Sequence, residues 1–366
     1  MSTGKLYPWL LAAFLLLATA ACTVSNDDED PDPGFVVPAL TLDNSIQFVV
    51  DYNSRSTLLV PAKGRLAIDW GDGQVEKIIE PETLVAGIKH TYSKLGKYRV
   101  KIWTGEATYL GLHAILLPVS DLTIGDCPKM KDLTIQGMHG LKKFDGARCP
   151  GISTLNIGNM STLTSIDLSQ CTELVDLTCF TFDSVTSLDL RQNKRLRSLE
   201  LNGLELTELK LQENDQLGTI EIYHSPLADV DWEQVPNLSS LMLYNNKFHS
   251  LRLNSLSYLH TLKCYVNELT SLDVSALASL RTLDCSQNKL EEVLLNGEAY
   301  LSSVSLHTNK LGAEALNAVF TLLRPSSEVQ SRPGVPCPIW IYGNPGTATC
   351  DKTIFVDKGW VVQEAK

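Results

Sequence analysis

The stretch LMLYNN at residues 241–246 determines the fold, because it recurs along the chain at a fixed interval. It returns as LKCYVN at 262–267, LDCSQN at 283–288 and VSLHTN at 304–309, each 21 residues after the one before. An apolar-x-apolar triplet alternates its side chains between two faces, as a short β-strand does. A period near 21 residues indicates a repeat architecture, in which each unit stacks on the next.

Triplets of this kind continue outward in both directions, and a second triplet stands about halfway through each period. They begin at Leu122, Leu133, Leu155, Ile166, Leu177, Leu188, Leu199, Leu209, Ile220, Val230, Leu241, Leu251, Leu262, Leu272, Leu283, Val293 and Val304. Asn193 and Asn214 follow triplets of the second series, preceded by Cys127, Cys149 and Cys171 at steps of 22. We therefore expect about nine coils, each with two short strands, in a rod about 40 Å long.

The pattern L-x-L-x-x-N, with Cys at some of the Asn positions, resembles the leucine-rich repeat. The resemblance implies a solenoid over residues 118–310, in which each Asn amide bonds backbone groups of neighbouring coils. The Asn markers change from one series of triplets to the other between Asn214 and Asn246, which leaves open which sheet is concave along the whole length. Helical spacing of apolar residues over 311–324 predicts a helix that caps the array at the start of a C-terminal module, 311–366.

The N-terminus has the features of an export signal. Lys5 precedes the apolar run LLAAFLLLA at residues 10–18, and small residues then lead to Cys22. This order resembles a bacterial lipobox, which implies that residues 1–21 are removed as a signal peptide and that Cys22 is acylated, for example with palmitate. The acidic segment 22–34 is expected to be a tether, and it resembles the signal that directs Bacteroidetes-type lipoproteins to the cell surface. Ordinary secretion and a plain linker are the alternatives.

Residues 35–117 contain several short alternating apolar and polar stretches separated by turns, which predicts a compact β-sandwich. The motifs DWGDG at 69–73, HTY at 90–92 and GKYRV at 96–100 resemble the PKD domain, an immunoglobulin-like sandwich of extracellular bacterial proteins. The carboxylates of the first motif are expected to stabilise a turn rather than bind calcium, because the spacing of a calcium loop is missing.

The fold class is therefore expected to be mainly β: a PKD-like sandwich, then a leucine-rich-repeat solenoid with a short helical C-terminal cap. The tail IWIYGNPG at 339–346 resembles the terminal module of Bacteroidetes-type leucine-rich-repeat surface lipoproteins, so this resemblance covers nearly the whole chain. Cys337 and Cys350 lie outside the repeat within the same module. We expect them to form a disulfide, because an exported chain enters a disulfide-permissive compartment.

Composition and motifs exclude several classes of function. The 366 residues include 31 Lys and Arg against 42 Asp and Glu, a formal net charge of −11, which disfavours a nucleic-acid partner. The sequence contains no zinc-ligand quartet, phosphate loop, dinucleotide fingerprint or nucleophile elbow. We therefore expect no metal, no cofactor and no enzymatic activity.

A candidate binding face lies on one series of strands, where the residue just after each triplet points outward. Aromatic residues concentrate at or beside this position, at Phe180, Tyr223, His224, Tyr244, Tyr265 and His307. Exposed Tyr residues provide rigid contact area with a polar tip, as partner-binding surfaces do. The preference of aromatic residues for exposed β-sheet positions explains the same column equally well.

These patterns predict a monomeric, non-catalytic lipoprotein, anchored in the outer membrane by its lipid alone and exposed at the cell surface. Its repeat face would bind a protein of a host or of a bacterial surface in adhesion. A periplasm-facing orientation is the alternative localisation. A glycan-binding accessory of a polysaccharide-uptake system is the alternative function, since aromatic rings stack on sugars and Asn202, Asn245 and His224 offer hydrogen bonds.

Overall fold

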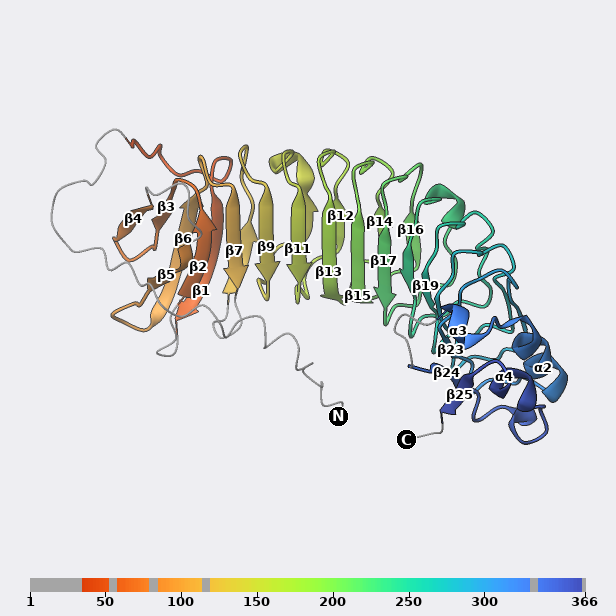
Figure 1. Cartoon of the computed structure of the whole chain (residues 1–366). Helices are drawn as coiled ribbons and strands as arrows, with labels where there is room; N and C mark the ends of the chain where they lie inside the picture. The colour runs from red at the N-terminus through yellow and green to blue at the C-terminus, as the bar shows by residue number, and fades with distance from the viewer. Residues whose placement is uncertain (1–34, 53–57, 79–84, 114–118, 330–334, 364–366) are drawn as a thin grey trace.

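In a computed structural model of the chain, one long sheet runs along most of the molecule and the fold is mainly β (Figure 1). The structure describes residues 35–52, 58–78, 85–113, 119–329 and 335–363. Within these ranges, no helix is both long enough and apolar enough to span a membrane.

The signal peptide 1–21, the acylation site Cys22 and the tether 22–34 lie outside the described residues. They stay predictions, as does the PKD-like character of residues 35–117.

The first series of triplets forms parallel strands of this fourteen-stranded sheet. Its repeat strands are β9 (Asp132–Gln136), β11 (Thr154–Gly158), β13 (Asp176–Phe182), β15 (Ser198–Leu204), β17 (Thr219–Tyr223), β18 (Ser240–Met242), β19 (Thr261–Lys263), β21 (Thr282–Asp284) and β23 (Ser303–Ser305). Triplets pair in register, with Leu155 opposite both Leu133 and Leu177. Equivalent apolar side chains therefore stack directly above one another and form one continuous core.

The second series forms shorter sheets on the other side of the coils. Parallel pairs join β10 (Lys143–Asp145) to β12 (Ser165–Asp167), β14 (Ser187–Asp189) to β16 (Glu208–Lys210), and β20 (Ser271–Asp273) to β22 (Glu292–Leu294).

Two triplets of this second series are not strands. At the first, the Asp231 carboxylate accepts from the Glu233 N–H at 3.2 Å and begins a 3₁₀ turn, Trp232–Gln234, so the expected extended geometry is lost. The triplet that begins at Leu251 has no assigned strand.

The Asn ladder is confirmed, and it occupies different corners of the coil in the two halves of the stack. The Asn214 Nδ2 donates to the carbonyls of Leu190 and Asn193, both at 3.0 Å. From residue 246 onward the ladder follows the main sheet instead, and the Asn288 Nδ2 donates to the carbonyls of Cys264 and Cys285. The repeat strands β9 to β17 have five to seven residues, and the repeat strands β18 to β23 have three. Beyond β17 the stack bends (Figure 1).

Each coil leaves the main sheet through one residue with positive φ. The series comprises Gly137, Asn159, Thr181, Gly203, His224, Asn245, Val266, Gln287, Thr308 and Gly343, with φ between 51° and 72°. Left-handed backbone suits Gly and Asn but is costly for β-branched residues. The positive φ of Val266 (56°) is therefore unfavourable for this residue, and the surrounding coil must stabilise the turn.

The N-terminal strands form two antiparallel layers that join the repeat. One sheet has the order β4-β3-β6-β1-β8, and the other strands, β5, β2 and β7, continue the main sheet. Their bounds are β1 Ile46–Tyr52, β2 Leu58–Lys63, β3 Leu66–Asp69, β4 Val75–Ile78, β5 Val85–His90, β6 Gly96–Trp103, β7 Tyr109–His113 and β8 Val119–Thr123. Strand β7 pairs in parallel with β9, whereas β8 pairs with β1. The expected domain boundary lies between residues 117 and 118. Strand β7, before this boundary, pairs with a strand after it, and β8, after the boundary, pairs with a strand before it.

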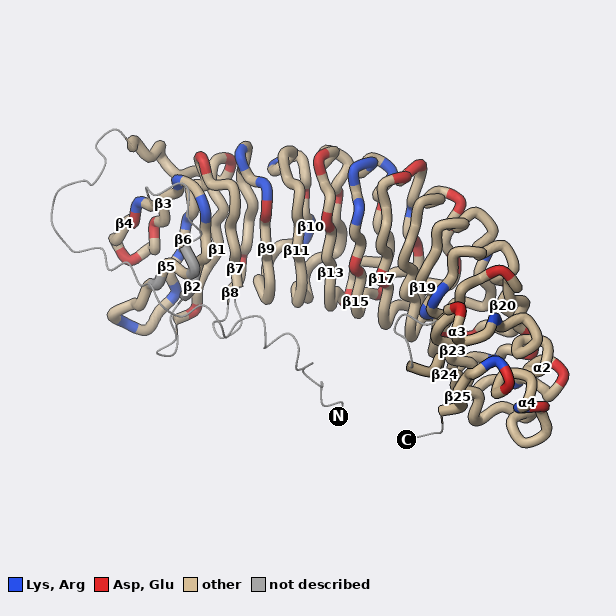
Figure 2. The backbone as a smooth tube through the Cα atoms, in the orientation of Figure 1, with Lys and Arg blue, Asp and Glu red and all other residues tan. Residues whose placement is uncertain are grey.

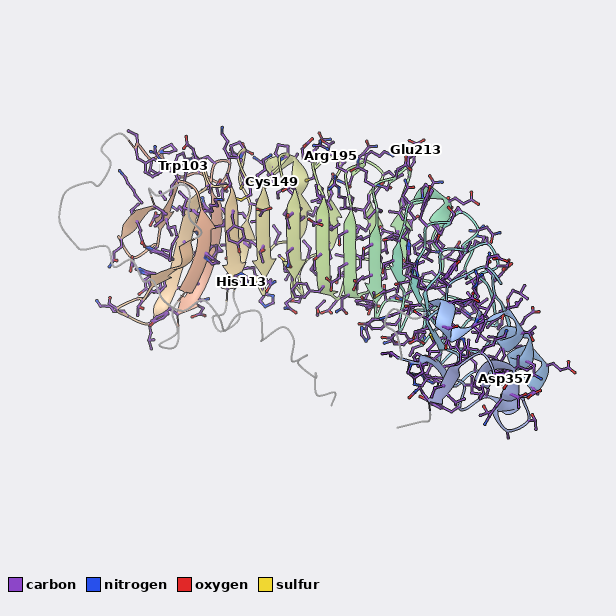
Figure 3. The ribbon with its side chains drawn as sticks, in the orientation of Figure 1. Trp103, His113, Cys149, Arg195, Glu213 and Asp357 are labelled. Atoms are coloured by element: carbon purple, nitrogen blue, oxygen red, sulfur yellow. The ribbon has the colours of Figure 1, made fainter. Side chains whose placement is uncertain are left out.

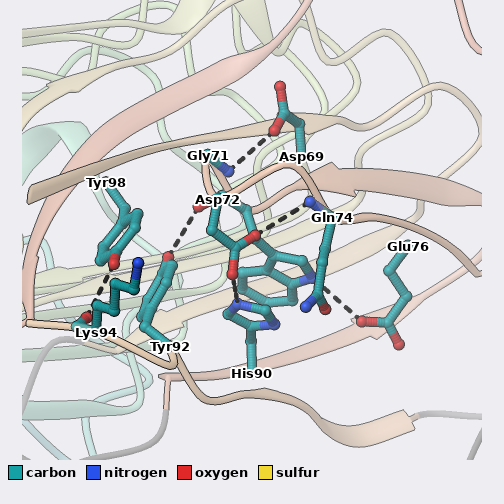
Figure 4. A network of polar contacts seen from close by, with 10 residues as sticks. Asp69, Gly71, Asp72, Gln74, Glu76, His90, Tyr92, Lys94 and Tyr98 are labelled. Carbon is teal, nitrogen blue, oxygen red and sulfur yellow. Dashed lines mark hydrogen bonds and ion pairs between the residues drawn. The ribbon is translucent and has the colours of Figure 1, made fainter.

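The DWGDG motif forms a compact polar network (Figure 4). The Asp69 carboxylate accepts a hydrogen bond from the Gly71 N–H at 2.9 Å, and the Asp72 carboxylate accepts one from the Gln74 N–H at 3.1 Å. His90 is buried, lies 2.9 Å from the second Asp72 oxygen and stacks on Trp70 with 4.6 Å between ring centroids. The two carboxylates therefore stabilise the turn, as the sequence predicts, and His90 packs against Trp70.

A helix lies within the expected C-terminal segment, and two further strands extend the sheet. Helix α2 (Ala313–Leu322) buries Leu316, Val319 and Phe320. The Lys358 amine donates to the carbonyls of Phe320, Thr321 and Leu323 and so satisfies the helix C-terminus. Strands β24 (Cys337–Trp340) and β25 (Trp360–Gln363) follow β23 in parallel, so the sheet edge is a strand and not the helix.

Candidate binding face

The outward face of the main sheet presents two columns of side chains, because the repeat strands pair in register. The column nearest the strand ends, here named the aromatic column, holds Gln136, Gly158, Phe180, Asn202, Tyr223, Tyr244, Tyr265, Ser286, His307 and Tyr342. The middle column holds Thr178, Glu200, Glu221, Met242, Lys263, Asp284, Ser305 and Trp340. Lys/Arg and Asp/Glu are interspersed along the stack (Figure 2).

Three of the six expected aromatic residues form one continuous stack. Tyr223 and Tyr244 lie 3.8 Å apart between ring centroids with a 20° interplanar angle, and Tyr244 and Tyr265 lie 4.9 Å apart at 8°. His224 contacts the edge of Tyr244 at 5.5 Å. The Tyr223 side chain is only 6% exposed, because Tyr244 covers its ring and its hydroxyl donates to Glu221. Tyr223 lies in the outward-facing column, as expected, but the expectation that it is exposed is wrong, while Tyr244 and Tyr265 are half-buried.

Phe180 and His307 belong to the same column but not to this stack. Phe180 is separated from Tyr223 by Asn202, and its ring lies over Gly158, whose missing side chain makes the space. His307 is separated from Tyr265 by Ser286 and stacks instead on Tyr342, at 4.4 Å and 11°.

Two aromatic residues of this face were missed from the sequence, Trp340 and Tyr342. The signal was present, since IWIYGN at 339–344 matches the repeat pattern, and Asn344 continues the ladder by donating to the Leu306 carbonyl at 2.9 Å. The helical insertion after residue 309 breaks the 21-residue step and hides the match.

A shallow hollow of about 360 Å³ lies at the C-terminal end of this face. Its lining comprises Lys263, Thr282, Leu283, Asp284, Ser303, Ser305, His307, Trp340 and Tyr342. Burial lowers the pKa of His307 more strongly than nearby Asp284 raises it, so its ring is uncharged at neutral pH. The hollow therefore combines neutral aromatic walls with a polar floor.

Two neighbouring carboxylates lie in the middle column. Glu200 on β15 stands opposite Glu221 on β17. Partial burial raises the pKa of both, and the charge of Glu221 raises that of Glu200 further. Lys263, two strands away, opposes the shift at Glu221. Among the residues described, no group of three or more His, Cys, Asp or Glu could hold a metal ion.

A second hollow, of about 290 Å³, lies at the other edge of the strands, lined by Lys131, Ser153, Glu173, Val175, Arg195, Arg197 and Gln216. Arg195 and His113 mark opposite edges of the stack (Figure 3). The Arg195 guanidinium is paired with the Glu173 carboxylate, so part of the positive charge there is already neutralised.

The expected Cys337–Cys350 disulfide is not formed in the structure. Both thiols are free and buried, and the Cys350 Sγ donates to the Thr347 carbonyl at 3.6 Å. Burial raises the pKa of both thiols, which keeps them protonated and unreactive at neutral pH. The repeat cysteines are free as well, and burial raises the pKa of Cys171 to about 11.

The sequence matches no protein family and no curated protein. Solved structures similar to the chain include the functional domain of InlJ from Listeria monocytogenes, whose description notes a cysteine ladder. The identity is 19% over 72% of this chain and 69% of that one, with a TM-score of 0.47. The leucine-rich-repeat domain of APL1B is 16% identical over 66% and 68% of the two chains, also at 0.47. An internalin, InlF, from Listeria monocytogenes is 17% identical over 71% and 87%, at 0.39. These similarities concern the arrangement of the backbone and not the function.

Proposed function

We propose that this protein is a non-catalytic interaction lipoprotein of leucine-rich-repeat type, which binds a protein partner in adhesion through the aromatic column. The observation that carries the proposal is the Tyr223–Tyr244–Tyr265 stack, in which Tyr244 and Tyr265 lie half-buried on a regular sheet. Stacked Tyr residues lose little conformational entropy on binding, because their neighbours already hold the rings.

Acylation at Cys22 and the acidic tether would anchor the protein in the outer membrane with the repeat facing outward. Protease treatment of intact cells should then release the repeat domain. Digestion only after lysis would instead indicate a periplasm-facing protein.

Binding is tested with the full chain as bait, in capture from host and bacterial surface proteins. The variant carries Tyr244→Ser and Tyr265→Ser, and the control carries Tyr258→Ser, an isolated Tyr that is 60% exposed. The double variant should weaken capture of a specific partner at least tenfold, about 1.4 kcal/mol, and the control should not. Equal capture by all three proteins would exclude the column as the site.

A further inference from the structure

We propose that the hollow of about 290 Å³ at the edge where the strands begin binds an acidic peptide segment, with one carboxylate at Lys131 and a second at Arg197. This site is named the basic hollow, and Arg195 marks its edge in Figure 3. It lies at the opposite edge of the sheet from the aromatic column, because its residues precede strands whose far ends form that column. The proposal does not depend on the protein partner inferred for the aromatic column.

The first argument is the local charge. The cationic residues that line the basic hollow are Lys131, Arg195 and Arg197. One carboxylate, that of Glu173, lies among them, whereas Asp132 and Asp176 at the starts of β9 and β13 do not line the hollow. The lining therefore has an excess of two positive charges in a chain whose formal net charge is −11. Such a local reversal of sign favours an anionic ligand.

The second argument is that two of the three cations are available to a ligand. Arg195 is paired with Glu173. The exposed Arg197 guanidinium forms no hydrogen bond or ion pair with any residue that the structure describes. The Lys131 amine donates to the Gly151 carbonyl at 3.1 Å, which leaves two of its three N–H groups for a ligand. A free guanidinium suits a carboxylate especially well, because its fork of donors forms two parallel bonds.

The third argument is the distance between these two cations. Lys131 directly precedes β9 and Arg197 directly precedes β15, with β11 and β13 between them. Three strand spacings amount to about 14 Å, so one carboxylate cannot contact both cations. An extended peptide advances about 3.3 Å per residue, and side chains four residues apart lie on the same face about 13 Å apart. Acidic residues at positions i and i+4 of an extended segment therefore match the two cations.

The fourth argument is the chemistry between the cations. Backbone bonds from Ser153 N–H to the Lys131 carbonyl (2.7 Å), from Val175 N–H to the Ser153 carbonyl (2.8 Å) and from Arg197 N–H to the Val175 carbonyl (2.8 Å) place the four residues in one row. Two short side chains thus stand between two long ones. The half-buried Val175 offers an apolar contact to a side chain between the two acids of a peptide, and a sulfated sugar has no such group to place there.

The decisive variant carries Lys131→Gln and Arg197→Gln. Both side chains are exposed, so the melting temperature should not change. Arg281→Gln is the matched control, because Arg281 is exposed and occupies the equivalent position in the coil of β21. Its neighbours in the row are His260 and Ser302, so no second Lys or Arg adjoins it.

A further variant, Glu173→Gln, releases Arg195 from its ion pair and adds one positive charge to the lining. It should strengthen peptide binding severalfold. Unchanged or weaker binding by this variant would contradict a site that depends on positive charge.

The full chain is titrated into two fluorescent peptides of identical composition, and binding is followed by polarisation at about 50 mM salt, where exposed charges are weakly screened. One peptide carries two glutamates four residues apart, and the other carries them side by side. We expect the spaced peptide to bind at least threefold more tightly than the adjacent one. The double variant should bind the spaced peptide at least fivefold more weakly than wild type, and Arg281→Gln should bind it equally.

Failure of the wild type to bind the spaced peptide would overturn the proposal. So would equal affinity for the two peptides, or a loss in Arg281→Gln as large as that in the double variant. A heparin hexasaccharide that binds more tightly than the spaced peptide, and is lost in the same double variant, would assign the basic hollow to an anionic glycan instead.

Discussion

The ring of Tyr244 covers the ring of Tyr223, with 3.8 Å between the two centroids. The aromatic column is therefore partly a structural element, since Tyr244 also packs on Tyr265 and His224. We expect Tyr244→Ser to lower the free energy of unfolding by about 2 kcal/mol and Tyr265→Ser by about 1 kcal/mol, because the first removes two stacked pairs and the second removes one. Denaturant titration of both variants measures the difference. Equal losses would mean that the stack adds nothing to the fold.

The ladder residue Asn288 supplies bonds that neither neighbouring coil can replace. Its amide donates to Cys264 and Cys285, and its oxygen accepts from the Leu269 N–H at 3.0 Å. Asn288→Ala leaves these buried backbone groups without partners, and we expect a loss of about 3 kcal/mol. Asn237→Ala is the control, because the amide of this exposed Asn makes one bond, to the Asp215 carbonyl. Its loss should stay below about 1 kcal/mol.

The turn at Val266 can be tested by exchanging residues between coils. Val266 and Asn245 occupy equivalent positions with φ of 56° and 55°. Asn tolerates this backbone better than Val, so Val266→Asn should stabilise the protein by about 1 kcal/mol and Asn245→Val should destabilise it by a similar amount. Thermal unfolding of the two single variants gives the sign directly. A destabilised Val266→Asn would show that side-chain packing outweighs the backbone preference.

The Glu200 carboxyl makes stability depend on pH. Its pKa is raised by burial and then by Glu221, so the folded protein holds this proton more tightly than the unfolded chain does. The free energy of unfolding therefore falls as pH rises from the ordinary pKa of Glu through the raised one. Glu200→Gln should raise the melting temperature at pH 7 and change it little at pH 4. The opposite order would mean that the charged form is the stabilised one.

The state of Cys337 and Cys350 follows from burial. Both thiols should resist alkylation in the native protein, and both should react after unfolding without a reductant. Peptide mass analysis then reports each site. A linked pair of peptides would show that the disulfide expected from the sequence forms during export.

The period, most of the strand triplets and the ladder were determined by the sequence alone, because each depends on residues within one coil or on a step of 21 or 22 residues. A strand followed by a turn is predicted by Leu241, Leu243 and Asn246, whatever the position of the coil in the stack. The charge balance and the absence of catalytic motifs could likewise be seen without coordinates.

Only the tertiary structure determined which side chains of the outward face are buried and which residues belong to it. Tyr223 is buried because a ring from the next coil covers it, and Trp340 and Tyr342 join the face across a helical insertion that interrupts the period. The burial of a side chain in a repeat protein depends on its contacts with neighbouring coils. Those contacts are determined by which side chains meet in register, and the pattern within one coil does not reveal them.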